Sequence, residues 1–154
     1  MTARLWEVDD THWPVVVMVF DGKQADEDIE HFIRRMDEVH ARCEPFVVLT
    51  LLRARAADLA NIAHVKRVGA WAKGGGARSN LYCKGSAIVA PSSAARFLIS
   101  SFFLVFVPAY PMVAFEDTSP AVAWLRRRLT ETGLPAPPTL ASLDAPGSPV
   151  LVAR

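Results

Sequence analysis

The stretch from Gly85 to Leu129 constrains the fold most strongly, because its residues mark four successive structural elements. An apolar run, GSAIVA, is followed by a very apolar segment from Ser93 to Val107, by the run MVAFED, and by a segment that ends in arginines. Short apolar runs bounded by turn residues predict buried strands, and the longer segments have the composition and start signals of helices. The order strand, helix, strand, helix predicts a parallel sheet with crossover helices.

The residues before this stretch predict more elements of the same kind. The runs at 15–20 and 46–52 are nearly all apolar, which is typical of strands buried on both faces. Residues 26–43 repeat apolar side chains at helical spacing, and residues 56–72 are helical in composition. A short strand at 5–8 is expected to pair antiparallel with 15–20 at the edge of the sheet. The sequence therefore predicts an α/β fold with a mixed, mostly parallel sheet and packed helices.

A change in composition after Leu134 divides the chain into two parts. The 154 residues suit one domain with a sizeable core, and we assign residues 1–134 to it. Residues 135–154 are rich in proline and show no apolar period. We therefore expect a flexible tail that adds nothing to the core.

Composition and charge argue against several classes of protein. The formal net charge is +1, which gives no electrostatic reason to expect nucleic acid as a partner. The longest apolar run stops at Pro108 and is too short to span a bilayer. No secretory signal is evident, and the two cysteines, Cys43 and Cys83, are expected to be reduced and buried. These features predict a cytoplasmic protein.

The sequence contains no pattern that predicts catalysis, a cofactor or a metal site. Its four histidines do not have the sequence spacing of metal ligands. Gly74-Gly75-Gly76 follow a predicted helix, whereas the glycines of a phosphate-binding loop follow a strand. A lysine and an arginine near Cys83 would lower the pKa of its thiol, but no partner base is identified. We therefore expect a protein that is not an enzyme.

Charges are unevenly distributed along the chain. Residues 21–44 hold eight acidic and four basic side chains, a net of −4, whereas residues 53–84 hold seven basic and one acidic, a net of +6. These segments can be ordinary solvated faces, or the basic one can be a patch for an acidic protein or an anionic head group. The basic residues of such a patch would be Arg53, Arg55, Lys66, Arg67, Lys73, Arg78 and Lys84.

The predicted helix from Ser93 to Val107 is apolar on nearly every side, which exceeds what contact with one sheet requires. Three explanations stay open: complete burial in the domain, an interface with a second copy or a partner, and a groove for an apolar ligand. The candidate interface residues are Phe97, Phe102, Phe103 and Phe106.

Several short motifs accompany this order of elements. They are Phe20-Asp21-Gly22, the acidic first turn Asp26-Glu27-Asp28, Trp71, the strand GSAIVA, and Phe115-Glu116-Asp117 before residues 121–125. With them, residues 5–129 resemble the SpoIIAA-like branch of the STAS fold, a family related to anti-sigma-factor antagonists. The resemblance implies a non-catalytic protein-interaction module. Residues 51–58 lack the hydroxyl residue that the family phosphorylates after its third strand, so no phosphoryl switch is expected there.

The leading hypothesis is therefore a STAS-like interaction or regulatory module that works through a protein partner or a homodimer. The alternative, from another functional class, is a carrier of a small apolar or lipid ligand. A closed pocket lined by Phe102, Phe106 and Met112 would favour the carrier. A flat, exposed patch on the apolar helix would favour the interaction module.

Overall fold

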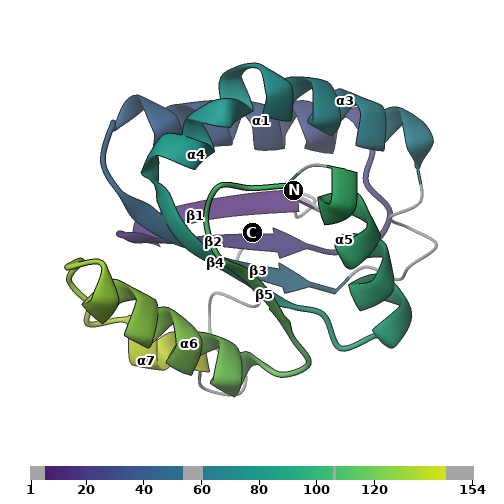
Figure 1. Cartoon of the computed structure of the whole chain (residues 1–154). Helices are drawn as coiled ribbons and strands as arrows, with labels where there is room; N and C mark the ends of the chain where they lie inside the picture. Colours follow the sequence, from purple (N-terminus) through teal and green to yellow (C-terminus); the bar gives the residue numbers. More distant parts are fainter. Residues whose placement is uncertain (1–5, 54–60, 106, 145–154) are drawn as a thin grey trace, which may run out of the picture.

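The computed structural model describes residues 6–53, 61–105 and 107–144, without the side chains of Phe102, Phe103 and Val105. In these residues the chain forms one five-stranded sheet between two layers of helices (Figure 1). The strands are β1 (Trp6–His12), β2 (Val15–Phe20), β3 (Phe46–Leu52), β4 (Cys83–Val89) and β5 (Met112–Phe115). The helices are α1 (Asp26–Ala41), α3 (Ile62–Lys73), the short 3-10 helix η1 (Gly75–Arg78), α4 (Ser79–Tyr82), α5 (Ser93–Val105), α6 (Thr118–Glu131) and α7 (Leu140–Asp144).

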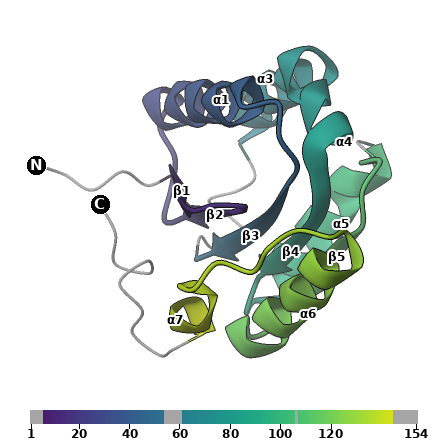
Figure 2. The ribbon, with the colours of Figure 1, turned by 90° about the vertical axis from the view of Figure 1, so that its left-hand side faces the viewer.

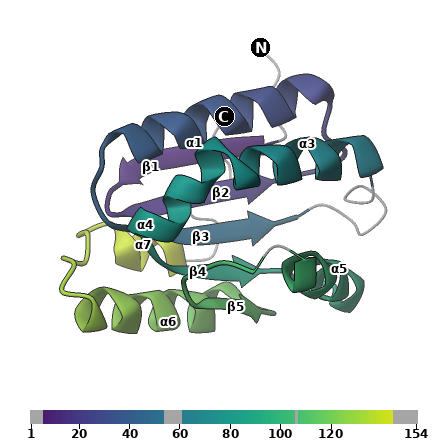
Figure 3. The same cartoon turned by 45° about the horizontal axis from the view of Figure 1, so that its top comes forward.

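The strands lie side by side in their order along the chain, from β1 to β5. β1 pairs antiparallel with β2, and every later pair is parallel, so the predicted mixed, mostly parallel sheet with an edge hairpin is confirmed. Right-handed crossovers that all advance in one direction place their helices on one face. For this reason α1, α3 and α5 share a face of the sheet, while α6 and α7 lie on the other (Figures 2 and 3).

The face toward α6 and α7 is filled by a continuous apolar core. Alternate residues of β2, β3 and β4 point to this face, because successive side chains of a strand point to opposite sides. The inner sides of α6 and α7 close over them. The core residues are Val15, Val17, Val47, Leu49, Leu51, Ala87, Val89, Ala121, Val122, Leu125, Leu129, Leu140 and Leu143.

α6 approaches β4 closely where the pairing of β3 with β4 changes register. A Cβ atom at Gly85 would lie 3.1 Å from the Trp124 ring and 3.3 Å from Arg128 Nε, so the absence of a side chain permits this close approach. Arg128 also donates hydrogen bonds to the Lys84 carbonyl from Nη2 at 2.6 Å and from Nε at 3.1 Å. A helix side chain thus satisfies a strand carbonyl at the irregular part of the ladder.

Two local expectations are corrected by the structure. The first strand extends to His12, because its later residues still pair with β2. Cys83 is buried as expected, but Cys43 is exposed in the turn after α1, so the prediction of two buried thiols is wrong for Cys43.

The segment after Leu134 contributes to the core, contrary to expectation. Leu140 and Leu143 are 1% and 2% exposed and belong to the core under α6. Their spacing places both side chains on one side of α7, and the Thr139 hydroxyl lies 2.6 Å from His12 Nδ1 at the end of β1. The prediction that this segment adds nothing to the core is therefore wrong at these two positions; residues 145–154 lie outside the described residues.

Replacing Leu143 by alanine should destabilise the domain, because it leaves a cavity in the core under α6. We expect the free energy of unfolding to fall by about 2–5 kcal/mol, as for other buried leucines. Urea denaturation followed by circular dichroism measures this, with Ala141→Ser on the exposed side of α7 as the control. A change for Leu143→Ala as small as that of the control would contradict the assignment of α7 to the core.

Candidate ligand cavity

The sheet face that carries α1, α3 and α5 forms the floor of a large cavity. Strand pairing places Val48, Ser86 and Met112 in one row across the sheet. Residues two positions further along each strand form the next row, Met18, Thr50, Ile88 and Ala114, on the same face. The floor is therefore mostly aliphatic and thioether side chains, with a hydroxyl group in each row.

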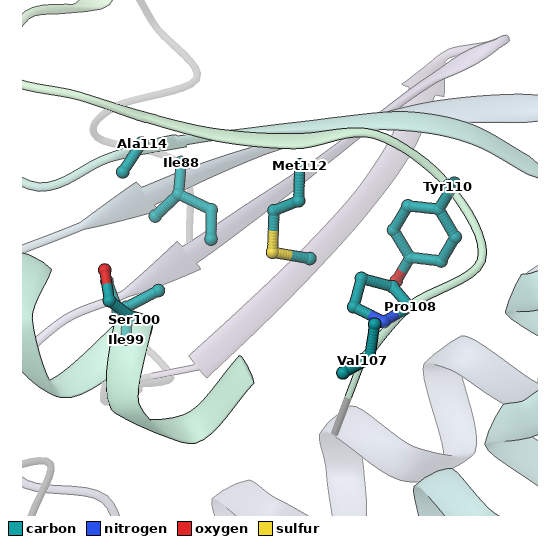
Figure 4. A pocket seen from close by; sticks show the side chains of 8 residues that line it. All are labelled: Ile88, Ile99, Ser100, Val107, Pro108, Tyr110, Met112 and Ala114. Atoms are coloured by element: carbon teal, nitrogen blue, oxygen red, sulfur yellow. The ribbon is translucent and has the colours of Figure 1, made fainter. Parts of the chain in front are cut away.

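The cavity between this floor and the three helices has a volume of about 900 Å³. The helices and the loop after α5 line its walls with Ile29, Phe32 and Met36 of α1, Val65, Val68, Trp71 and Ala72 of α3, Leu98, Ile99 and Ser101 of α5, and Val107, Pro108 and Tyr110. A smaller space of about 300 Å³ shares most of these α5-side residues and reaches Ala114 and Ser100. Figure 4 shows Ile88 and Met112 of the sheet facing the same space as Ile99 of α5.

Polar contacts hold α3 beside α1. Arg67 forms a bidentate ion pair with Glu30, with Nε–Oε1 at 2.7 Å and Nη2–Oε2 at 3.0 Å. His64 Nε2 lies 2.8 Å from Asp26 Oδ1. The hydrogen bond from Arg67 lowers the pKa of Glu30. The acidic first helix and the basic second helix of the sequence thus face each other along these contacts.

Trp71 extends this link toward the sheet. Its indole Nε1 donates to Asp37 Oδ1 at 3.1 Å, and its ring contacts Phe32 of α1 edge-on at 5.5 Å between centroids. Arg78 Nη2 lies 3.4 Å from the same Asp37 oxygen. A side chain at Gly76 would meet the Trp71 ring at 2.8 Å, so the glycine leaves the space in which this ring lies. Trp71 therefore forms a fixed part of the cavity wall.

The groups nearest the floor are uncharged. Burial raises the pKa of the Cys83 thiol to about 12, and burial also raises the pKa of Tyr110. The prediction that nearby cations lower the Cys83 pKa is wrong, because desolvation outweighs Lys84 and Arg128. The charged or titratable lining residues on α3 are His64 and Lys73.

The predicted site residues do not lie together in the structure. Met112, one of the three residues named for a closed ligand pocket, lines this cavity, which is partly open. The side chains of Phe102 and Phe103, and the whole of Phe106, lie outside the described residues. Phe97 is 71% exposed and does not line the cavity.

The basic patch is also divided. Arg53 and Lys66 are exposed, whereas Arg67 is paired with Glu30. Arg55 lies outside the described residues. Thr50 and Ser86 of the floor were not among the predicted site residues, although each is visible in the sequence as a lone hydroxyl residue in an apolar strand.

Comparison of the chain with protein-family models, with curated proteins and with solved structures finds no match. Within residues 6–53, 61–105 and 107–144, no cluster of three or more His, Cys, Asp or Glu side chains is arranged to hold a metal ion. In the same part of the chain, no helix has the length and apolar character needed to cross a membrane.

His40 packs against Trp71, a residue of the cavity wall. It is fully buried on α1, its ring stacks on Trp71 at 6.0 Å between centroids, and its Nε2 lies 2.6 Å from the Ser79 hydroxyl. Burial, together with the positive charge of Arg78, lowers the pKa of His40 from 6.5 to about 4. The folded protein therefore holds this imidazole neutral.

Acidification should destabilise the protein through His40. In the unfolded chain the His40 imidazole binds a proton below its ordinary pKa of 6.5, whereas in the folded chain it does so only near pH 4. The free energy of unfolding therefore decreases as the pH falls from about 6.5 to about 4. The full effect, reached below about pH 4, is on the order of 3 kcal/mol, and about 2 kcal/mol of it is lost by about pH 5. Urea denaturation at about pH 7.5 and about pH 5 measures it. His40→Gln should lose less stability between these two values; an equal loss would contradict the assignment.

Proposed function

We propose that the chain binds a small apolar molecule in the cavity between the sheet and helices α1, α3 and α5. The observation that carries the proposal is the size and lining of this cavity, about 900 Å³ bounded mostly by aliphatic, aromatic and thioether side chains. Binding sites for small molecules are typically about 300–1,000 Å³, largely apolar, with a few polar groups. The cavity has each of these properties.

The methionines support the same proposal. The chain has four, and Met18, Met36 and Met112 all line the cavity. Methionine side chains are unbranched and polarisable, and they adapt to ligands of irregular shape. Their concentration at one site favours a binding function that accommodates a bulky apolar body.

The proposed function is binding without catalysis. A buried thiol becomes a nucleophile only as the thiolate, and burial keeps Cys83 protonated. The aliphatic floor offers no acid or base to activate a water molecule. A ligand in this cavity would be held and carried rather than transformed.

Filling the cavity should abolish binding without unfolding the protein. Val68 of α3 lines the cavity, and Val68→Trp places a large ring in the space proposed for the ligand. The matched control is Val113→Trp, because Val113 of β5 is 37% exposed and outside the lining. Binding is measured by the fluorescence of N-phenylnaphthylamine, a neutral apolar probe. We expect wild type and Val113→Trp to bind the probe and Val68→Trp to bind it at least about tenfold more weakly, a loss of about 1.4 kcal/mol.

Circular dichroism confirms that each variant is folded before binding is compared. If wild-type protein does not enhance the fluorescence of the probe, the proposed function is wrong. If Val68→Trp binds as tightly as Val113→Trp, the probe occupies another site and the proposal fails in the same way.

A second candidate function is the STAS-like interaction module, acting in the cytoplasm through a protein partner or a second copy. The observation that favours it is the exposed apolar surface of α5. Phe97 and Leu104 are 71% and 82% exposed, more apolar surface than a free helix of a monomer usually presents. Aromatic residues concentrate binding energy at such interfaces. The arrangement of strands and helices is consistent with this module, which we propose in its homodimeric form.

This second candidate predicts a dimer that depends on Phe97. Phe97→Asp would place a charge in an apolar contact and should convert the dimer to a folded monomer. Leu81→Asp on α4 is the matched control, because Leu81 is also an exposed apolar residue, at 65%. Size-exclusion chromatography with light scattering distinguishes the states. A wild-type monomer at high micromolar concentration would overturn the homodimer.

A further inference from the structure

The floor of the cavity contains two buried hydroxyl groups. Thr50 of β3 and Ser86 of β4 are 7% and 4% exposed and both line the cavity. Ser86 pairs with Val48, and Thr50 pairs with Ile88, so the two hydroxyl residues are diagonal neighbours on adjacent strands. They lie on one face of the sheet, surrounded by Met18, Val48, Ile88 and Met112.

No hydrogen bond joins either hydroxyl group to another residue within the described part of the chain. Trp6, which also lines the cavity, has a buried indole Nε1 without a partner. A buried polar group without a partner costs free energy, so native structures satisfy such groups with protein, water or ligand atoms. The hydroxyl oxygens of Thr50 and Ser86 are not among these fully enclosed atoms, and both residues line the cavity. They are therefore available to hydrogen-bond a polar group of the occupant.

The same surroundings restrict the charge of that polar group. The floor beneath it is aliphatic, and the nearby thiol of Cys83 is neutral because it is buried. No charged side chain belongs to the floor itself, and His64 and Lys73 lie on the α3 wall, so an ionised group on this floor would lose hydration without a counter-ion in the same row, which is unfavourable. Desolvation of a neutral hydroxyl or carbonyl group costs far less free energy. Such a group can form hydrogen bonds with the hydroxyl groups of both Thr50 and Ser86.

We propose that the ligand is an uncharged molecule with an apolar body and one hydroxyl or carbonyl group, which lies on the floor against Thr50 and Ser86. This inference rests on the proposed binding function. It adds the chemical class of the ligand and its orientation: polar end on the sheet, apolar body toward the methionines and the helices.

The test uses the full chain and displacement of N-phenylnaphthylamine by three competitors of similar length: n-octanol, nonane and octanoate at neutral pH. The variants are Thr50→Val, which has the same shape without the hydroxyl, and Ser86→Ala. Thr50→Ser is the control, because it keeps the hydroxyl group. Each lost hydrogen bond should weaken octanol binding by about fivefold. Nonane binding should stay within about twofold of wild type in every variant, because nonane makes no hydrogen bond.

The outcomes distinguish failure of this inference from failure of the proposed function. Selective loss of octanol binding in Thr50→Val and Ser86→Ala, with retention in Thr50→Ser, supports it. If the probe binds but octanol and nonane change together, or neither changes, the hydroxyl groups do not contact the ligand and the inference is wrong, while the binding function stands. Tighter binding of octanoate than of octanol to wild type would also overturn it. Failure of the probe to bind wild type removes the proposed function itself.

Discussion

The link between α3 and α1 is the interaction on which the rest of the structure depends. Arg67 with Glu30, His64 with Asp26, and Trp71 with Asp37 join the two helices side by side. A helix after β3 would ordinarily rest directly on the sheet and bury an apolar stripe there. Here the apolar side of α3 faces the cavity instead, and its polar side contacts α1. The hollow over β3, β4 and β5 lies beneath this pair of helices.

The two faces of the sheet therefore have different roles. Under α6 and α7 the side chains form a filled core, which supplies apolar burial and fixes the register of the parallel strands. On the opposite face the same strands present Val48, Thr50, Ser86 and Ile88 to an open interior space. A sheet made rigid from one side is a suitable platform for a site on the other, since binding groups on strands are positioned more firmly than groups on loops. The binding function proposed above depends on this division.

Much of the fold could be predicted from local patterns, and most of the site could not. Apolar runs such as residues 46–52 identify strands by themselves, and the spacing of Ile29, Phe32 and Met36 identifies the buried side of α1. The cavity depends on where α3 lies, and α3 contacts α1 through residues almost forty positions apart in the sequence, such as Glu30 with Arg67 and Phe32 with Trp71. From sequence alone the same charges predicted a surface patch. α7 was missed because flanking prolines obscured the helical spacing of two leucines.

The methionine methyl groups offer the most direct test of the central claim, that the interior space binds an apolar molecule. Three of the four methionines, Met18, Met36 and Met112, line the cavity. In protein with isotope-labelled methionine methyl groups, titration with N-phenylnaphthylamine should shift these three signals strongly, because an aromatic ring among them changes their magnetic surroundings. Substitution of each methionine by leucine assigns its signal. Saturable binding of the probe with these three signals unmoved would place the ligand elsewhere and contradict the account.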